Sequence, residues 1–211
     1  MHKVFLLAVF LGSALFVQAQ YPGYNTIADP VKFREQFASA SQKTQSIKSD
    51  FVQEKNLSML SEKIISKGKF WFKKESQVRM EYNTPFQYLM IINKDKVYVK
   101  DGQKENKMSS RSNKLFQQIN RIMVDCMQGT ALNNPDFKTR QFEGKSAYLV
   151  ELTPVSKGLK DLFKEIVVYI DKTNYAVNSL EMHEPSGDNT TIRFTNKELN
   201  ASLPDALFDI K

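Results

Sequence analysis

From Ser49 onward the chain is a succession of short runs rich in β-branched and aromatic residues, each followed by a link of a few turn-forming residues. The first five runs are FVQEKNLSML, IISKGKFWFKK, QVRMEY, YLMIIN and KVYVKDG, and the links include KESQ, NTP and NKDK. Runs of this composition predict β-strands. Because a parallel crossover needs a dozen or more residues, strands joined by links this short must pair antiparallel.

Two stretches carry helical spacing instead. Asp29 and Pro30 predict a helix N-terminus, since they suit the N-cap and the first helical position. Apolar-face positions then recur every three or four residues, at Phe33, Phe37, Ala40, Thr44 and Ile47. A second helix is predicted over 113–126, ending near Gly129, and the runs FKTRQFE, SAYLVELTPV, EIVVYID, AVNSLEMHE and TTIRFTNKEL follow it.

This order of elements predicts an α+β fold with a curved antiparallel sheet of about ten to eleven strands. No linker, repeat or Ser/Gly-rich break divides the pattern, so we expect residues 20–211 to form one domain. Several strands are apolar on one face, and a long sheet of that kind curls around that face. Two helices cover little of a wide concave sheet, which leaves either an apolar cavity or a tightly curled core.

The N-terminal segment MHKVFLLAVFLGSALFVQAQ joins a basic start at Lys3 to an apolar run from Val4 to Val17. A membrane-spanning helix needs about 20 apolar residues, so this run is too short for one. Val17 and Ala19 lie where a signal peptidase reads small or tolerated residues. Residues 1–19 are therefore predicted to be a cleaved secretory signal peptide, the alternative being an uncleaved membrane anchor.

Composition excludes several kinds of site. With 1 Cys and 2 His, the chain has too few ligands for a zinc site or a thiolate cluster, and its 8 Gly form no phosphate-binding loop, so we expect no metal and no cofactor. The formal net charge of +7 and the basic, aromatic run KGKFWFKK would otherwise favour nucleic acid. An exported protein meets no nucleic acid, so the charge is expected to face solvent, anionic lipid or an acidic partner.

Catalysis has one candidate pair, Cys126 and His183, with Glu184 as a group that could orient the imidazole. Cys126 falls on the apolar face of the second predicted helix, where a lone Cys behaves as a small hydrophobic residue. Neither a further partner nor an oxyanion donor can be identified. A Cys-dependent hydrolase is therefore an outside alternative, and we expect the protein not to be an enzyme.

Four segments carry a resemblance to a known family. They are FVQEK with Phe51 and Gln53, GKFWFKKESQVRMEY from Gly68 to Tyr82, the segment from Pro85 to Asn93, and LPDALFDI at 203–210. In this order they are similar to the F-x-Q, G-x-L-W-x-K-R-P, P-x-x-x-L-I-V-x-D-G and F-x-F segments of the LolA-type periplasmic outer-membrane lipoprotein carriers. The resemblance spans most of the mature chain and agrees with the export signal.

The resemblance implies an unclosed half-barrel with helices forming a lid over an apolar cavity. It implies a periplasmic carrier, expected to be a monomer, that takes acylated lipoproteins from an inner-membrane release complex to an outer-membrane acceptor. On this reading, the residues expected to line the cavity are Phe70, Phe72, Val78, Met80, Leu89, Ile91, Val97 and Val99. Those expected on the lid are Leu115, Phe116, Ile119 and Met123.

The family ties its lid down with a basic residue in the K-R-P loop. Lys74 matches that residue here, Glu75 replaces the Pro, and Arg79 lies close by on the opposite strand face. Each buried CH₂ stabilises a bound lipid by about 0.8 kcal/mol, so a shuttle needs open and closed lids of similar energy. A binding module or sensor for another amphiphile, such as a glycolipid, a pigment or a mislocalised lipoprotein, is the alternative function.

Overall fold

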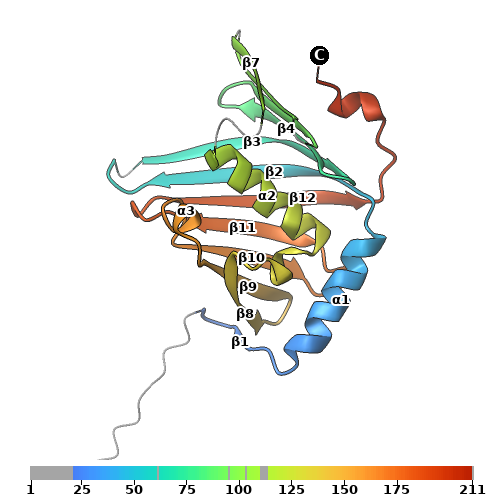
Figure 1. Ribbon diagram of the computed structural model, residues 1–211, viewed down its shortest axis with the longest axis vertical. Coiled ribbons are helices and arrows are strands. Elements are labelled where there is room, and N and C mark those ends of the chain that lie inside the picture. The colour runs from blue at the N-terminus through green and yellow to red at the C-terminus, as the bar shows by residue number, and fades with distance from the viewer. Residues whose placement is uncertain (1–20, 61, 95, 103, 110–113, 211) are drawn as a thin grey trace, which may run out of the picture.

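The computed structural model describes residues 21–60, 62–94, 96–102, 104–109 and 114–210. These residues form one curved antiparallel sheet with the α-helices against its concave face (Figure 1). The strands are β1 (Asn25–Thr26), β2 (Ser46–Leu57), β3 (Glu62–Lys73), β4 (Gln77–Thr84), β5 (Tyr88–Asn93), β6 (Lys96–Asp101), β7 (Lys104–Ser109), β8 (Phe137–Glu143), β9 (Ala147–Pro154), β10 (Glu165–Asp171), β11 (Val177–His183) and β12 (Asn189–Leu199). The helices are α1 (Pro30–Lys43), α2 (Lys114–Gln128) and α3 (Lys157–Lys160), with the 3-10 helices η2 (Ala131–Asn133) and η3 (Asp205–Phe208).

The sheet runs in the order β1-β8-β9-β10-β11-β12-β2-β3-β4-β5-β6-β7, so β12 joins two meanders by pairing with β2. Among the described residues β1 and β7 end this order without pairing to each other, and the sheet is open. The predicted α+β fold with a curved, unclosed antiparallel sheet is confirmed. The described residues form 12 strands, more than expected, because β1 and β7 give no strand signal in the sequence: β1 has only two residues, and β7, with the sequence KENKMS, lacks an apolar alternation.

Helix α1 begins where the sequence predicts. The Asp29 side chain accepts a hydrogen bond from the Lys32 backbone N–H at 2.9 Å, and Pro30 is the first helical residue. The prediction that its apolar face continues to Ile47 is wrong. The helix ends at Lys43, and Ile47 is a buried residue of β2 that pairs with Phe72, so its side chain reaches the same core from a strand.

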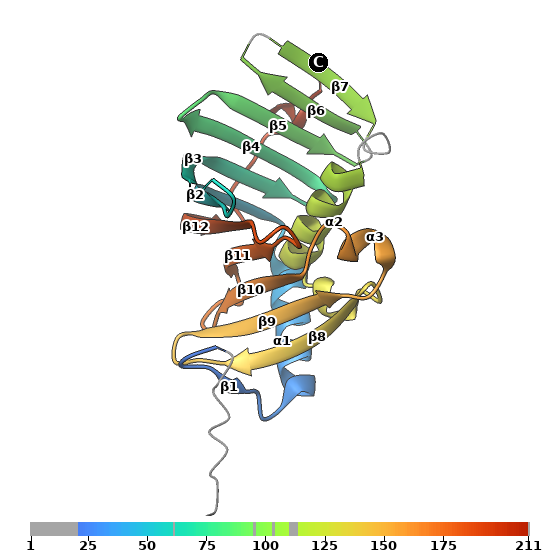
Figure 2. The same cartoon turned by 90° about the vertical axis from the view of Figure 1, so that its left-hand side faces the viewer.

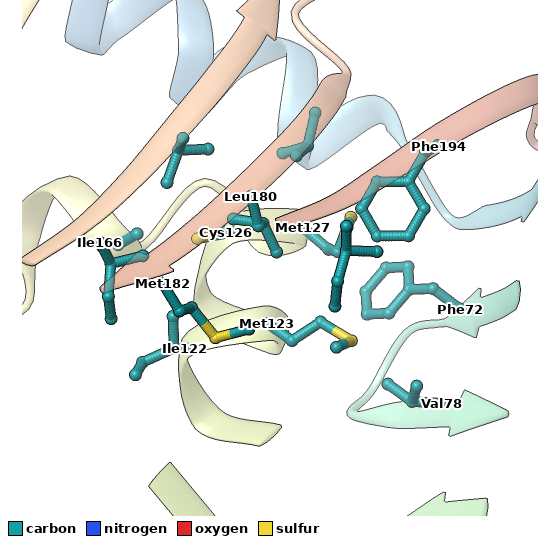
Figure 3. Packing of buried hydrophobic residues seen from close by; sticks show 14 of the residues in the cluster. Phe72, Val78, Ile122, Met123, Cys126, Met127, Ile166, Leu180, Met182 and Phe194 are labelled. Atoms are coloured by element: carbon teal, nitrogen blue, oxygen red, sulfur yellow. The ribbon is translucent and has the colours of Figure 1, made fainter. Parts of the chain in front are cut away.

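Helix α2 lies across the concave face, and Figure 2 shows α2 and α3 on the same side of the curved sheet. The side chains of Ile122, Met123, Cys126 and Met127 are buried against the sheet, in the spacing expected of one helical face (Figure 3). None of the helices in the described ranges is long and apolar enough to cross a membrane.

The convex face of β3 to β6 is covered by the C-terminal segment. Phe208 of η3 is fully buried there against Trp71 and Ile91. Arg79 Nη1 donates to the Leu207 carbonyl at 2.9 Å, and Asn93 Nδ2 donates to the Phe208 carbonyl at 3.1 Å. This part of the sheet is therefore apolar on both faces.

Candidate functional site

A cavity of about 400 Å³ lies on the concave side of the sheet, where strands from both meanders meet α2. This volume is within the range of about 300–1,000 Å³ typical of small-molecule sites. Its apolar lining residues are Met80, Tyr82, Tyr88, Met90, Met123, Leu162, Phe163, Met182, Pro185 and Ile192. Its polar lining residues are Gln53, Lys55, Asp161, Glu184, Ser186 and Thr190.

Four of the lining side chains are methionines from three parts of the fold. Met80 and Met90 lie directly opposite each other on β4 and β5. Figure 3 shows Met123 of α2 next to Met182 of β11. Methionine is unbranched and polarizable and adapts to irregular apolar shapes, so this lining suits a flexible hydrocarbon guest better than a rigid one.

The two tyrosines in the lining keep their protons at neutral pH. Burial raises the pKa of both Tyr82 and Tyr88, most strongly for Tyr82. Their rings meet edge to face with centroids 5.3 Å apart, and the Tyr82 hydroxyl donates to Gln53 Oε1 at 3.0 Å. These hydroxyls therefore add polarity to the cavity wall without adding charge.

The charged lining residues lie toward the turn ends of their strands. Lys55, near the end of β2, forms an ion pair of 3.8 Å with Glu184, which follows β11. Their side chains remain about one-third exposed, so solvent reaches them. This ion pair lies at the same end of the sheet as α3 and the β2–β3, β4–β5 and β11–β12 turns. We call this end of the molecule the mouth end.

Six of the eight residues expected to line the cavity are buried on the concave side, namely Phe70, Phe72, Val78, Met80, Val97 and Val99. Of these, Met80 lines the cavity described above, whereas Phe72 and Val78 belong to the packed core next to α2 (Figure 3). A role for any of them in binding lipid stays a prediction.

The expectation that Leu89 and Ile91 face the cavity is wrong. Ile91 is buried with Trp71 and Phe208 on the convex face, and Leu89 packs against the same cluster. Their neighbours Met90 and Ile92 point to the concave core instead. The run YLMIIN is apolar at every position except its last, so its alternation cannot identify the inner face.

The expected lid residues can be placed only in part. Met123 is buried and lines the cavity. Leu115, Phe116 and Ile119 belong to α2 by their backbone, but their side chains lie outside the described residues.

The two expected lid-lock residues bind other segments. Lys74 Nζ donates to the Gln42 carbonyl at 2.7 Å, which ties the β3–β4 turn to the last turn of α1. A cation is favourable there because a helix C-terminus carries partial negative charge. Arg79 lies on the convex side, where it forms an ion pair with Glu81 and stacks near the Trp71 ring, 5.9 Å from its centroid.

The Cys126 and His183 pair of the hydrolase alternative is not assembled. Cys126 is buried in the concave core, and burial raises the pKa of its thiol, which disfavours the reactive thiolate. His183 alternates with the inward Met182 on β11 and lies 3.7 Å from Glu181, on the other face of the sheet. In the described part of the chain, no three His, Cys, Asp or Glu side chains are arranged to hold a metal ion.

Several residues that line the cavity were not among those expected, although their sequence pattern indicates the inner face. Tyr82 shares the alternation of Val78 and Met80 in QVRMEY, and Met182 shares that of Leu180 in AVNSLEMHE. Leu162 and Phe163 gave no periodic signal because they lie in the link between α3 and β10.

The chain has matches among known families and solved structures. The model of the family described as outer membrane lipoprotein carrier protein LolA matches residues 42–211. An uncharacterized conserved protein from Thermus thermophilus is similar with a TM-score of 0.51 and 9 % identity, covering 85 % of this chain and 93 % of that chain. This likeness supports the fold alone.

Two further solved structures are similar at lower TM-scores. A LolA superfamily protein from Nitrosomonas europaea has a TM-score of 0.45 and 10 % identity, with 85 % of this chain and 96 % of that chain covered. A putative outer membrane lipoprotein-sorting protein domain from Vibrio parahaemolyticus has a TM-score of 0.45 and 14 % identity, with coverages of 84 % and 95 %. No curated protein sequence matches the chain.

Proposed function

Because the chain belongs to the LolA family of outer membrane lipoprotein carrier proteins, we propose that it carries lipoproteins across the periplasm by their acyl chains. The family membership also bears out the resemblance carried by the four sequence segments. The proposed partners are acylated lipoproteins, an inner-membrane release complex and an outer-membrane acceptor. We propose that the carrier acts as a monomer after removal of its signal peptide.

The observation that supports this proposal best is the cavity beneath α2. Its wall combines four methionines with two tyrosines, which are neutral at physiological pH and whose pKa values burial raises further. Each CH₂ group buried in such a site contributes about 0.8 kcal/mol, so a single acyl chain is a strong ligand. The charged side chains of Lys55 and Glu184 lie at the end of the cavity that is open to solvent, where the polar part of a lipoprotein would leave it.

The cavity must enlarge before it can hold several acyl chains. About 400 Å³ lies near the lower end of the range for small-molecule sites, so several acyl chains need more space than this state offers. Met123 joins α2 to the cavity wall, and displacement of this helix would enlarge the space. We propose that α2 is the moving lid and that the donor complex supplies the energy for loading.

The test uses one lipoprotein in two forms, with and without its acyl chains. The mature protein is expected to release the acylated form from inner-membrane vesicles into a soluble one-to-one complex. It is expected to form no complex with the form that lacks acyl chains. A fluorescent acyl probe should bind the mature protein and be displaced by the acylated lipoprotein. Failure of both the release and the probe binding would contradict the proposal.

Mass spectrometry of material that copurifies with the protein separates this function from binding of other amphiphiles. Diacyl or triacyl lipopeptides support the proposal. A single glycolipid or pigment, retained while the acylated lipoprotein is refused, would identify a different binding module on the same fold.

A further inference from the structure

Large apolar side chains are exposed at one end of the molecule. The described residues of this kind are Val31, Met59, Leu60, Ile64, Ile65, Phe86 and Val155. All except Val31 belong to the mouth end. The most exposed lie at the tips of two turns, with Met59 91 % and Leu60 63 % exposed between β2 and β3 and Phe86 77 % exposed between β4 and β5.

The β2–β3 turn is held in place beside the cavity. Ser58 donates from its backbone N–H and from its hydroxyl to Asp188 Oδ1, both at 2.9 Å, and its hydroxyl is 3.2 Å from the Ser186 carbonyl. Ser186 itself lines the cavity. Figure 1 shows this turn, the β11–β12 turn and α3 at the same end of the sheet. The base of the turn that carries Met59 and Leu60 is therefore tied to the wall of the cavity.

The same end presents positive charge that has no acidic partner. Lys157, Lys160 and Lys164, in and after α3, are exposed, and no carboxylate in the described ranges lies within ion-pair distance of them. Of the described acids at this end, Glu184 pairs with Lys55 and Asp188 accepts from Ser58, whereas Asp161 lines the cavity and forms no ion pair with these lysines. Exposed apolar tips and unpaired lysines on the same end of the molecule match the interface of a bilayer with anionic headgroups.

We propose that the mouth end docks on an anionic phospholipid bilayer, with Met59, Leu60 and Phe86 entering the interface and the lysines around α3 contacting the phosphates. This inference rests on the proposed function and names a further partner of the same site. The apolar side chains project singly from separate turns, so they suit a deformable lipid surface better than the pockets of a protein partner. An acyl chain leaving the cavity here reaches hydrocarbon without crossing water.

The test measures cosedimentation of the mature protein with vesicles of phosphatidylethanolamine and phosphatidylglycerol, and with vesicles of phosphatidylcholine alone. The double substitution Met59→Ser with Leu60→Ser is expected to lower the partition coefficient roughly tenfold on the anionic vesicles. Its matched control is Val31→Ser, because Val31 is 62 % exposed on α1 at the other end of the sheet. The control is expected to partition like the wild type.

The contribution of the lysines in α3 to vesicle binding is tested with a second variant and its control. Lys157→Gln with Lys160→Gln is expected to remove the preference for anionic vesicles and to keep the weaker binding to phosphatidylcholine. The control is Lys145→Gln in the β8–β9 turn, an exposed lysine at the opposite end of the sheet. Equal loss for the single substitutions Lys157→Gln and Lys145→Gln, which remove one charge each, would mean that net charge alone drives binding and would overturn the proposed orientation.

Wild-type partitioning of the Met59/Leu60 variant would overturn the docking surface. So would a change in oligomeric state, measured by light scattering, without a change in vesicle binding, because the tips would then join two copies of the chain. Uptake of the acyl probe without vesicles tests the cavity separately. Probe uptake with no vesicle binding rejects the docking surface alone, and vesicle binding with no probe uptake rejects the carrier function alone.

Discussion

Gly129, just after α2, lies directly against Ser41 of α1. A Cβ atom placed on Gly129 would be 2.5 Å from Ser41 Oγ and 2.7 Å from Ser41 Cβ, closer than real side chains approach. Gly129 also has a φ of +73°, in the left-handed region that glycine adopts without a steric penalty. The ends of the two helices are thus joined by a contact that only glycine allows.

Gly129→Ala is therefore expected to lower the free energy of unfolding by about 1–3 kcal/mol, since alanine is strained at this φ and must also displace Ser41. Urea unfolding measures the effect. Gly158→Ala in α3 is the control, because a Cβ there meets nothing within 4 Å and no positive φ opposes it. Equal stability of the two variants would show that the helix contact is not a constraint.

Met90 and Leu89 are sequence neighbours on opposite faces of β5, so they test which face binds the guest. Met90→Gln places an amide in the cavity wall and is expected to weaken binding of an acyl probe about tenfold, as burial of an unpaired polar group costs roughly 1–3 kcal/mol. Leu89→Gln is expected to change the affinity by about twofold or less. A larger loss for Leu89→Gln, measured by fluorescence titration, would place the guest on the convex face.

Acid should weaken the fold through Glu151. Burial alone would raise the pKa of this carboxyl, but hydrogen bonds from Arg140 and Tyr21 outweigh it and hold the pKa below the ordinary value of 4.5. The lowered folded pKa means that this stabilisation is present above pH 4.5 and is lost as pH falls toward the folded pKa.

Glu151→Gln is expected to be less stable than the wild type at neutral pH and to lose less further stability on acidification. Urea unfolding at a series of pH values from neutral to below 4.5 measures both effects. Glu198→Gln serves as the control, because its exposed ion pair with Lys48 contributes little. If Glu151→Gln left the acid dependence of stability unchanged, the Glu151 carboxyl would not contribute to acid unfolding.

The C-terminal segment should detach when its buried anchor is removed. Phe208 is fully buried against Trp71, and Phe208→Ala is expected to cost about 3–5 kcal/mol if the site does not collapse. Trp71 is the single tryptophan of the chain, so its fluorescence should shift toward that of a solvated indole. Phe86→Ala, at an exposed turn, should leave the fluorescence unchanged.

Binding of the acyl probe by folded Phe208→Ala should match that of the wild type, because Phe208 and the cavity lie on opposite faces of the sheet. Loss of probe binding without loss of folding, judged by circular dichroism, would show that the convex cluster supports the cavity.

Local patterns were enough to predict the antiparallel strands and the two longer helices. Short links force neighbouring strands to pair antiparallel, and Asp29 with Pro30 supplies a local start signal for α1. They failed at the end of α1, where Ile47 continues the helical spacing by coincidence. The helix ends at Lys43, and Ile47 then pairs with Phe72 in the β2–β3 ladder, so its side chain reaches the core from a strand.

The inner face of β5 could not be read from YLMIIN, because both faces of this strand are buried. The cover on the convex face comes from Phe208, more than a hundred residues further along the chain, so no local window contains the information. The same holds for the cavity, which needs Met80, Met123 and Met182 from three separate elements. Hydrophobic alternation acts between neighbours in sequence and therefore predicts strands, whereas a hollow forms only where α2 crosses two meanders joined by the pairing of β12 with β2.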